Sequence, residues 1–365
     1  MAQLDRSFRA WGLTGLVAAI AVAGGLTESL GLRAIDEAAL IVAAVAAFLT
    51  LALVTKRVCG AERLVYYHHE IAVVTVCAAL AAVLGAPVLP HLDATVVGLG
   101  AFLAFGRIGC LRVGCCHGRP ARRGIRYGAE HVAAGVAPYL QGVTLLPIQA
   151  IESVAVACLV VASGAVALAG AAPGTAAMLY LSGYAVLRFG FEELRGDTAR
   201  RYWRGLSEAQ WISLGVVAAE LALAVLHVLP ATAVAGFAAA ALAADGAVVV
   251  CRRAWVDSPV EPRRLRELER VARAIATTPS GDAAPTAPIE VWELPGGMRL
   301  STAHVGTVRH VTLSRAPGPL TPTDARHLAR VIGATCATPP VDVVDGVGAT
   351  YHVLMPLRAG PWAHQ

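Results

Sequence analysis

The stretch that decides the fold is "ATVVGLGAFLAFGRIGCLRVGCCHGRP", residues 94–120. Its first part, residues 94–111, is almost entirely apolar, and a cluster of glycine, cysteine, arginine and histidine follows at once. A membrane-spanning helix needs about 20 mostly apolar residues, so the first part predicts such a helix. The second part places polar groups at the end of the helix, where they are expensive unless they pair or have a function.

Similar apolar runs recur along the first 255 residues. Hydrophobic residues make up 56% of the 365-residue chain and charged residues only 15%, whereas an ordinary soluble domain has about 25% charged residues. The other predicted spans are residues 11–26, 38–55, 70–86, 147–169, 174–192, 209–229 and 232–251. The last is the weakest, because it is rich in alanine and carries Asp245. We predict an all-α polytopic membrane protein with seven or eight transmembrane helices.

The end of the chain has a soluble composition. "EPRRLRELERVARAIA" (261–276) predicts a charged helix with one apolar side, and a linker rich in Ala, Thr and Pro follows it. Residues 289–294, 298–302, 307–314 and 350–356 are strand-like, and residues 322–334 are helical with Pro at the start. The expected organisation is a transmembrane domain over 1–255, a charged helix and linker over 256–288, and a small soluble α+β extramembrane domain over 289–365.

Basic residues cluster after alternate spans, so they all fall on one face of the membrane. Five of them follow the span 94–111 and four follow the span 174–192. One interpretation is the positive-inside rule, which would make this face cytoplasmic. The other is that several arginines bind an anionic lipid headgroup through charge-assisted contacts.

Polar residues also lie within the spans. In "LRFGFEELR" (187–195), Arg188, Glu192 and Arg195 share one helix face, and Tyr184 lies one turn earlier. These residues are either a functional group or an ion pair that holds two helices in register. "YYHHE" (66–70) places His68 and His69 where a span begins, and they are either a general base or interfacial residues.

The segment after residue 105 has three interpretations. The three cysteines and His117 could bind a metal such as zinc, or one cysteine could be a reactive thiolate near arginines. Alternatively, its glycines let the backbone fold tightly, so that Arg107 and Arg119 converge on a ligand.

Two more polar segments open later spans. "PIQAIES" (147–153) carries Gln149 and Glu152, and "GLSEAQWIS" (205–213) carries Gln210, with Ser207 suited to an N-cap. Five segments, 66–70, 106–120, 147–152, 184–195 and 207–213, therefore open on the same face, and together they predict one site.

In this pattern the sequence resembles the prolipoprotein diacylglyceryl transferase family over about residues 60 to 230. "GRIGCLRVGCCHGR" resembles the family signature GRIGNFxNGExxGR, and "GYAVLRFGFEELRGD" resembles YGxxRFxxExxREPD. "PIQAIES" and "LSEAQWISL" resemble its PxQLYE and LSxGQxLSL segments, and "YYHHE" takes the place of its HGG motif.

The resemblance implies an enzyme that transfers a diacylglyceryl group from phosphatidylglycerol to the cysteine thiol of a prolipoprotein signal peptide. It implies a multi-pass protein of a bacterial plasma membrane, with no cofactor, no metal and no nucleic acid. The residues expected to be catalytic are His68, His69, Arg107, Arg188 and Glu192, with one of the two histidines in the place of the family histidine. Those expected to bind substrate are Tyr184, Arg195, Gly118, Arg119, Gln149, Glu152 and Gln210.

The sequence also departs from the family pattern. Cys110, Val113 and Cys115 replace two asparagines and a glutamate of the signature, so the hydrogen bonding around the headgroup must differ. The family places these loops on the outer face, against the positive-inside interpretation. Two other functions stay open: a non-catalytic or differently specific lipid-binding relative, and a membrane thiol or metal protein built on Cys110, Cys115, Cys116 and His117.

Overall fold

The computed structural model describes residues 2–60, 65–197, 200–230, 233–255, 259–277, 291–305, 308–316, 318–338, 342–347 and 350–356. These fall into two compact units. The first lies within residues 1–119, 146–195 and 201–250, and the second lies within 120–145, 196–200 and 251–365. The second unit thus takes in an internal segment, 120–145. The domain limits drawn from the sequence stay a prediction.

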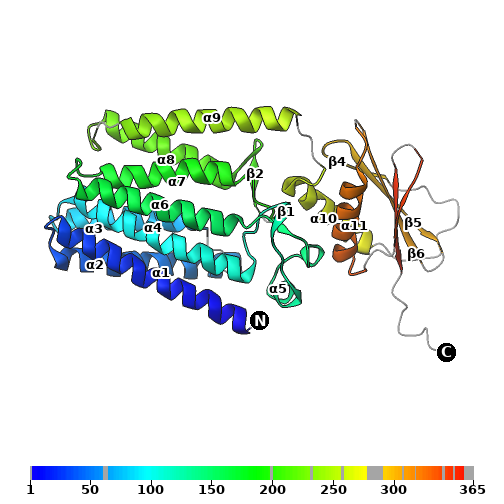
Figure 1. Ribbon diagram of the computed structural model, residues 1–365, viewed down its shortest axis with the longest axis horizontal. Helices are drawn as coiled ribbons and strands as arrows, with labels where there is room; N and C mark the ends of the chain where they lie inside the picture. Colours follow the sequence, from blue (N-terminus) through cyan, green and yellow to red (C-terminus); the bar gives the residue numbers. More distant parts are fainter. Residues whose placement is uncertain are drawn as a thin grey trace. The chain divides into compact units, whose positions relative to one another are not determined.

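The first unit is a bundle of long helices that run side by side (Figure 1). The helices are α1 (Ala2–Ser29), α2 (Ala34–Cys59), α3 (Tyr66–Val83), α4 (Val88–Val113), α6 (Ile148–Leu168), α7 (Thr175–Phe191), α8 (Glu208–Val225) and α9 (Ala233–Trp255). A two-stranded hairpin, β2 (Tyr202–Trp203) and β3 (Leu206–Ser207), leads into α8.

Each of the predicted spans coincides with one of these helices. Among the described residues, seven helices, all of the bundle except α7, are long and apolar enough to cross a membrane. The seven include α9, the least certain of the predictions. Helix α7 has 17 residues and packs between α6 and α8. The predicted class, a polytopic helical membrane protein with a small further domain, is confirmed.

Helix α4, which contains the stretch quoted first, lies at the centre of the bundle and packs against α1, α3, α6 and α7. Glycines allow the close approach. A Cβ added at Gly98 would lie 2.8 Å from the Ala19 carbonyl oxygen of α1, and one added at Gly100 would run into the Tyr180 ring of α7. The apolar run of α4 therefore forms the core on which the polar end of the helix is built.

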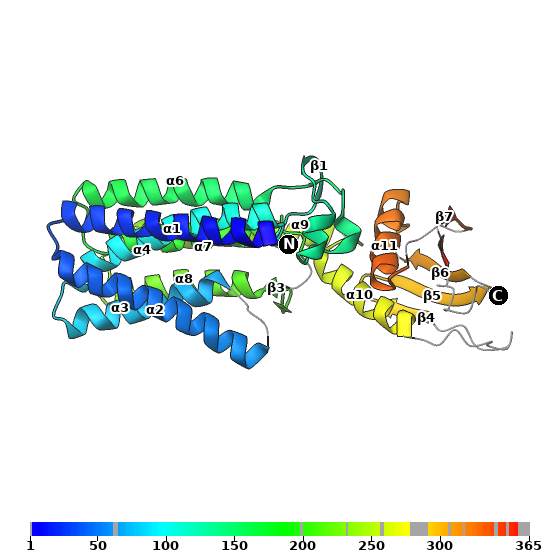
Figure 2. The same cartoon turned by 90° about the horizontal axis from the view of Figure 1, so that it is seen from below.

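The second unit contains a five-stranded antiparallel sheet in the order β4-β5-β6-β8-β7 (Figure 2). Its strands are β4 (Val291–Leu294), β5 (Met298–Val305), β6 (Val308–Arg315), β7 (Asp342–Asp345) and β8 (Tyr351–Pro356). Its helices are α10 (Pro262–Thr277) and α11 (Pro322–Thr335), and the internal segment adds β1 (Pro120–Ile125), α5 (Ala129–Ala133) and a short 3-10 helix (Pro138–Leu140).

One hydrophobic core joins the sheet, both helices and the internal segment. The internal segment contributes Tyr127, Val136, Tyr139, Leu140 and Leu145. Helix α10 contributes its predicted apolar side: Leu265, Leu268, Val271, Ala272 and Ile275. The loop between α4 and α6 is thus packed into the same core as the end of the chain.

The elements of the C-terminal part match the prediction closely. Four strands and α11 lie where they were expected, although residues 289 and 290 and the linker lie outside the described residues. Strand β7 was missed because it is only four residues long and has Asp342 and Asp345 at its ends, and aspartate is depleted in strands.

Candidate functional site

A buried ion pair joins α4 to α6 at one end of the bundle. Arg107 Nη2 lies 2.9 Å from Glu152 Oε1, and both side chains are less than a tenth exposed. The Tyr184 hydroxyl of α7 donates a hydrogen bond of 3.0 Å to the same oxygen. Buried charges need such partners, so one carboxylate connects α4, α6 and α7.

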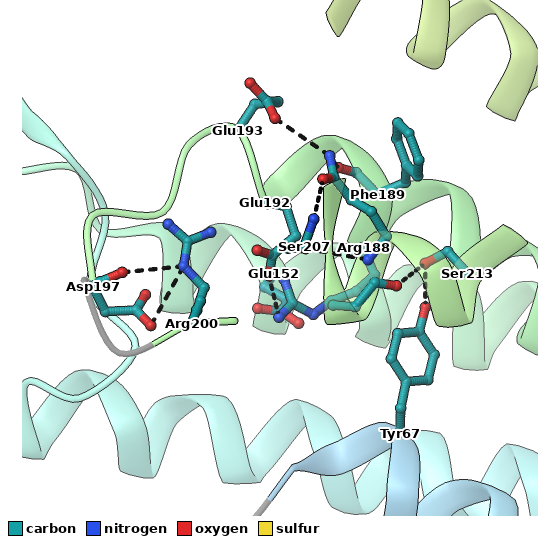
Figure 3. A network of polar contacts seen from close by, with 12 residues as sticks. Tyr67, Glu152, Arg188, Phe189, Glu192, Glu193, Asp197, Arg200, Ser207 and Ser213 are labelled. Carbon is teal, nitrogen blue, oxygen red and sulfur yellow. Dashed lines mark hydrogen bonds and ion pairs between the residues drawn. The ribbon is translucent and has the colours of Figure 1, made fainter. Parts of the chain in front are cut away.

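A second buried ion pair lies at the C-terminal end of α7. Arg188 Nη2 lies 2.5 Å from Glu192 Oε1, at the i,i+4 spacing expected from the sequence. The charges of Glu192, Arg195 and Glu152 all act on the Arg188 guanidinium. Figure 3 shows Glu152, Arg188 and Glu192 gathered at one place. Arg107 and Arg188 therefore both lie beside Glu152, as a single site requires.

The loop after α4 is tied to the segment after α7. Gly118 pairs with Arg195 in an antiparallel bridge, and Arg119 donates its backbone N–H to the Leu194 carbonyl at 3.0 Å and its Nε to the Arg195 carbonyl at 3.4 Å. A Cβ at Gly118 would run into the Leu146 carbonyl oxygen. Glycine is required here because two backbones meet, and this contact places Arg195 next to the pairs described above.

Gln149 and Gln210 hold backbone in place. Gln149 donates a hydrogen bond of 2.8 Å to the Cys115 carbonyl. Gln210 forms a capping box with Ser207 at the start of α8, and its Nε2 donates to the Phe189 carbonyl at 3.4 Å and to Glu193 at 3.3 Å. Ser207 is the N-cap, as predicted. Both glutamines, expected to contact substrate, use the described contacts to position the loop after α4 and the end of α7.

The two histidines that open α3 have different surroundings. His68 is 43% exposed, and its Nε2 lies 2.9 Å from Glu208 Oε1 of α8. His69 is buried, its ring stacks on Phe48 of α2 with centroids 4.2 Å apart, and its Nδ1 has no hydrogen-bond partner among the described residues. Among the residues that the structure describes, no contact links either imidazole to the arginine group.

Tyrosines provide that link instead, and the sequence interpretation named only Tyr184 among them as a site residue. The Tyr67 hydroxyl lies 2.7 Å from Ser213 Oγ of α8 (Figure 3), and the Tyr66 hydroxyl lies 3.2 Å from that of Tyr180. Both α3 rings pack against the ring of Tyr184, with centroids 5.3 and 5.5 Å away. The spacing of residues 180 and 184, one turn apart on α7, was the signal that could have identified this cluster.

The turn after α4 gathers the three cysteines. Gly114, which caps the C-terminal end of α4, has a left-handed backbone conformation. Cys116 has a φ of 54°, which is rare for a residue with a side chain. The sulfur atoms of Cys110, Cys115 and Cys116 all lie within 4.8 Å of one another. Hydrogen bonds from the other two thiols, with the positive charges of two nearby arginines, lower the pKa of the Cys116 thiol.

His117 does not join this cluster. Its Nδ1 lies 3.0 Å from the carbonyl oxygen of Gly118, and the group of sulfur atoms contains no histidine. The GCCH arrangement is therefore a three-sulfur cluster, with His117 bound to the adjoining backbone.

The site has an excess of positive charge. Three guanidinium groups, those of Arg107, Arg188 and Arg195, are buried with two carboxylates, those of Glu152 and Glu192. Arg107 Nε and Arg188 Nη1 are buried with no hydrogen-bond partner among the described residues. Unpaired guanidinium donors favour an anion with several oxygens, because arginine binds phosphate through two N–H groups at once.

Comparison with known proteins gives the same family as the motifs. Residues 64–226 match the family model described as prolipoprotein diacylglyceryl transferase. Two similar proteins, both called phosphatidylglycerol–prolipoprotein diacylglyceryl transferase, come from strains of Dehalococcoides mccartyi. The first is 36% identical over 129 residues, or 35% of this chain and 47% of the relative. The second is 35% identical over 134 residues, or 36% of this chain and 49% of the relative.

The chain thus spans about half the length of the curated relatives it matches. No solved structure matches it. The matched region contains α3, α4, α6, α7 and α8 with the segments between them, and so every predicted site residue. Over residues 64–226, this chain is therefore similar to proteins of the prolipoprotein diacylglyceryl transferase family.

Proposed function

We propose that this chain is a bacterial plasma-membrane transferase that moves a diacylglyceryl group from phosphatidylglycerol to the cysteine thiol of a prolipoprotein signal peptide. In this reaction the bond between the glycerol carbon and the phosphate oxygen breaks, and a carbon–sulfur bond forms. Glycerol phosphate leaves with the bonding electron pair, and the thiol proton passes to a base.

The observation that carries the proposal is the arrangement of Arg107 and Arg188 around Glu152. Their free buried N–H groups suit two oxygens of one phosphate, and Arg195 adds a third positive charge nearby. Charge grows on the phosphate as the carbon–oxygen bond breaks, and guanidinium groups already held in place stabilise it without reorganisation. The pairs with Glu152 and Glu192 supply that positioning.

We assign the base to His68. Its imidazole is partly exposed, so a peptide thiol can reach it, and Glu208 is placed to orient the ring and stabilise the imidazolium form. His69 is buried against Phe48, and we assign it to packing. The names of the two relatives, which pair phosphatidylglycerol with a prolipoprotein, support the choice of substrates.

Complementation tests the proposal. A bacterial strain whose own diacylglyceryl transferase is switched off would express the full chain, the Arg188→Gln variant, or the Val154→Ala variant of an exposed position on α6. The proposal expects growth with the wild type and with Val154→Ala, and none with Arg188→Gln at equal membrane levels. Equal failure of all three, beside growth with a family enzyme, would contradict it.

A relative that binds the lipid without transferring it would give a different result. The replacement of signature residues by Cys110, Val113 and Cys115 is the observation that favours this second function. Such a protein would retain phosphatidylglycerol on purification in an Arg188-dependent manner and would not support growth.

A further inference from the structure

We propose that Cys110, Cys115 and Cys116 form a binding site for a thiophilic divalent metal ion, with Zn²⁺ as the natural occupant and one coordination position left open. This inference does not depend on the proposed transferase activity. It departs from the expectation of no metal, because that expectation came from a family signature that lacks these cysteines.

Distances between the sulfur atoms are the first argument. The three atoms lie within 4.8 Å of one another. In a tetrahedral zinc site with Zn–S bonds of about 2.3 Å, the sulfurs are separated by about 3.8 Å. A closing movement of about an ångström or less would therefore bring all three to bonding distance.

Backbone geometry is the second argument, because adjacent cysteines rarely bind one ion. Side chains of consecutive residues point apart in an extended strand. The left-handed residues Gly114 and Cys116 reverse the chain and return Cys115 and Cys116 to the last turn of α4, where Cys110 lies. The Cys115 thiol even lies 3.9 Å from the Cys110 carbonyl oxygen.

A positive φ at a cysteine is costly, and surrounding structure must hold it. Gln149 binds the Cys115 carbonyl at 2.8 Å, and the bridge between Gly118 and Arg195 fixes the far side of the turn. The cluster is thus formed before any ion binds, which lowers the cost of ordering the ligands.

Charge and access are the third argument. A divalent ion with three thiolates carries one net negative charge, and the positive charges of Arg195 and Arg107 act on Cys116. Cys115 is exposed, while Cys110 and Cys116 are half-buried, so an ion can reach the sulfurs from solvent. No fourth Cys, His, Asp or Glu among the described residues joins the group. Three protein ligands with an open position are typical of reactive zinc sites, whereas purely structural sites have four.

The test uses the full chain, purified under reducing conditions that prevent disulfide formation. Metal content is measured by mass spectrometry after dialysis against Zn²⁺, and the zinc environment by X-ray absorption. Co²⁺ is then exchanged in, and the thiolate-to-cobalt charge-transfer band in the near ultraviolet is recorded. We expect about one zinc ion per chain, a shell of three sulfurs at about 2.3 Å, and a strong cobalt band.

Variants identify the ligands. Cys116→Ser and Cys115→Ser should lower metal affinity by more than the roughly 10- to 100-fold that changes outside the ligand shell cause. Cys158→Ser removes an exposed thiol on α6 and should change nothing. The proposal is overturned if the wild type binds no stoichiometric zinc and gives no cobalt band. It is also overturned if its zinc shell lacks sulfur, or if Cys158→Ser reduces binding as much as Cys116→Ser.

Discussion

Arg107 and Glu152 form a buried ion pair of 2.9 Å that joins the polar end of α4 to the start of α6. The Tyr184 hydroxyl reaches the same carboxylate oxygen from α7. Glu152 was expected to contact substrate, but its described contacts are with the chain's own arginine and tyrosine. We infer that it positions the arginine that binds the phosphate.

This relationship predicts different outcomes for two substitutions at position 152. Glu152→Ala leaves a buried, unpaired arginine, a change that costs about 3–5 kcal/mol in buried ion pairs, so it should lower the melting temperature. Glu152→Gln keeps an acceptor oxygen for Tyr184 and should stay folded, but with weaker transfer activity because Arg107 is no longer fixed. Thermal unfolding in detergent and activity in vesicles measure the two effects. Val154→Ala, an exposed position on the same helix, is the control, and equal activity of Glu152→Gln and wild type would contradict the positioning role.

Gly118 offers a test of the loop geometry. In Gly118→Ala, the added Cβ would run into the Leu146 carbonyl oxygen and separate the two backbones, so the bridge to Arg195 should break. Gly106 has nothing within 4 Å of an added Cβ, which makes Gly106→Ala a matched control in the same motif. We expect Gly118→Ala to lose most of its transfer activity and Gly106→Ala to keep it. Similar activity of the two variants would show that the contact is not needed.

Substitutions of the two histidines distinguish the proposed general base, His68, from His69, which we assign to packing. His68→Gln should reduce turnover, by the 10²- to 10⁴-fold typical of general acid–base catalysis, with little change in stability, because the side chain is partly exposed. His69→Gln should instead lower stability, because the ring packs on Phe48. Turnover at saturating peptide and thermal unfolding distinguish them. The reverse pattern, with activity lost only at position 69, would move the base to His69.

The second unit should become less stable as the pH falls. Burial, and then the positive charge of His352, lower the pKa of His310 below its ordinary 6.5, and burial and Arg330 lower that of His327. The unfolded chain therefore binds more protons than the folded unit once the pH falls below 6.5, so stability is lost in that direction and is fully present above it. Pulse proteolysis of the full chain in denaturant, below and above pH 6.5, measures this. The double variant His310→Gln/His327→Gln should show a smaller difference between the two conditions, and an unchanged difference would contradict the assignment.

The sequence predicted the helices well because each is a continuous apolar run, and a membrane requires such runs. It also predicted which five segments meet, because their polar residues all lie where spans begin or end on one face. It could not predict which side chains pair. Whether Glu152 meets Arg107 or a substrate depends on a contact between residues 45 positions apart, for which local periodicity contains no information.

Other features were beyond prediction for similar reasons. The left-handed backbone of Cys116 is stabilised by Gln149 from another helix, so nothing within the turn itself indicates it. The packing of residues 120–145 into the core with α10 and the sheet joins parts of the chain that are far apart in sequence. Tyr66 and Tyr67 were read as part of a histidine motif, although their rings are what contact α7.

The most direct measurement is the mass of a lipobox peptide after incubation with the purified chain in vesicles containing phosphatidylglycerol. We expect the peptide to gain one diacylglyceryl group on its cysteine sulfur, with release of glycerol phosphate, and to stay unmodified with the Arg188→Gln variant. A peptide left unmodified by the wild-type chain, in vesicles where an established enzyme of the family modifies it, would contradict the account.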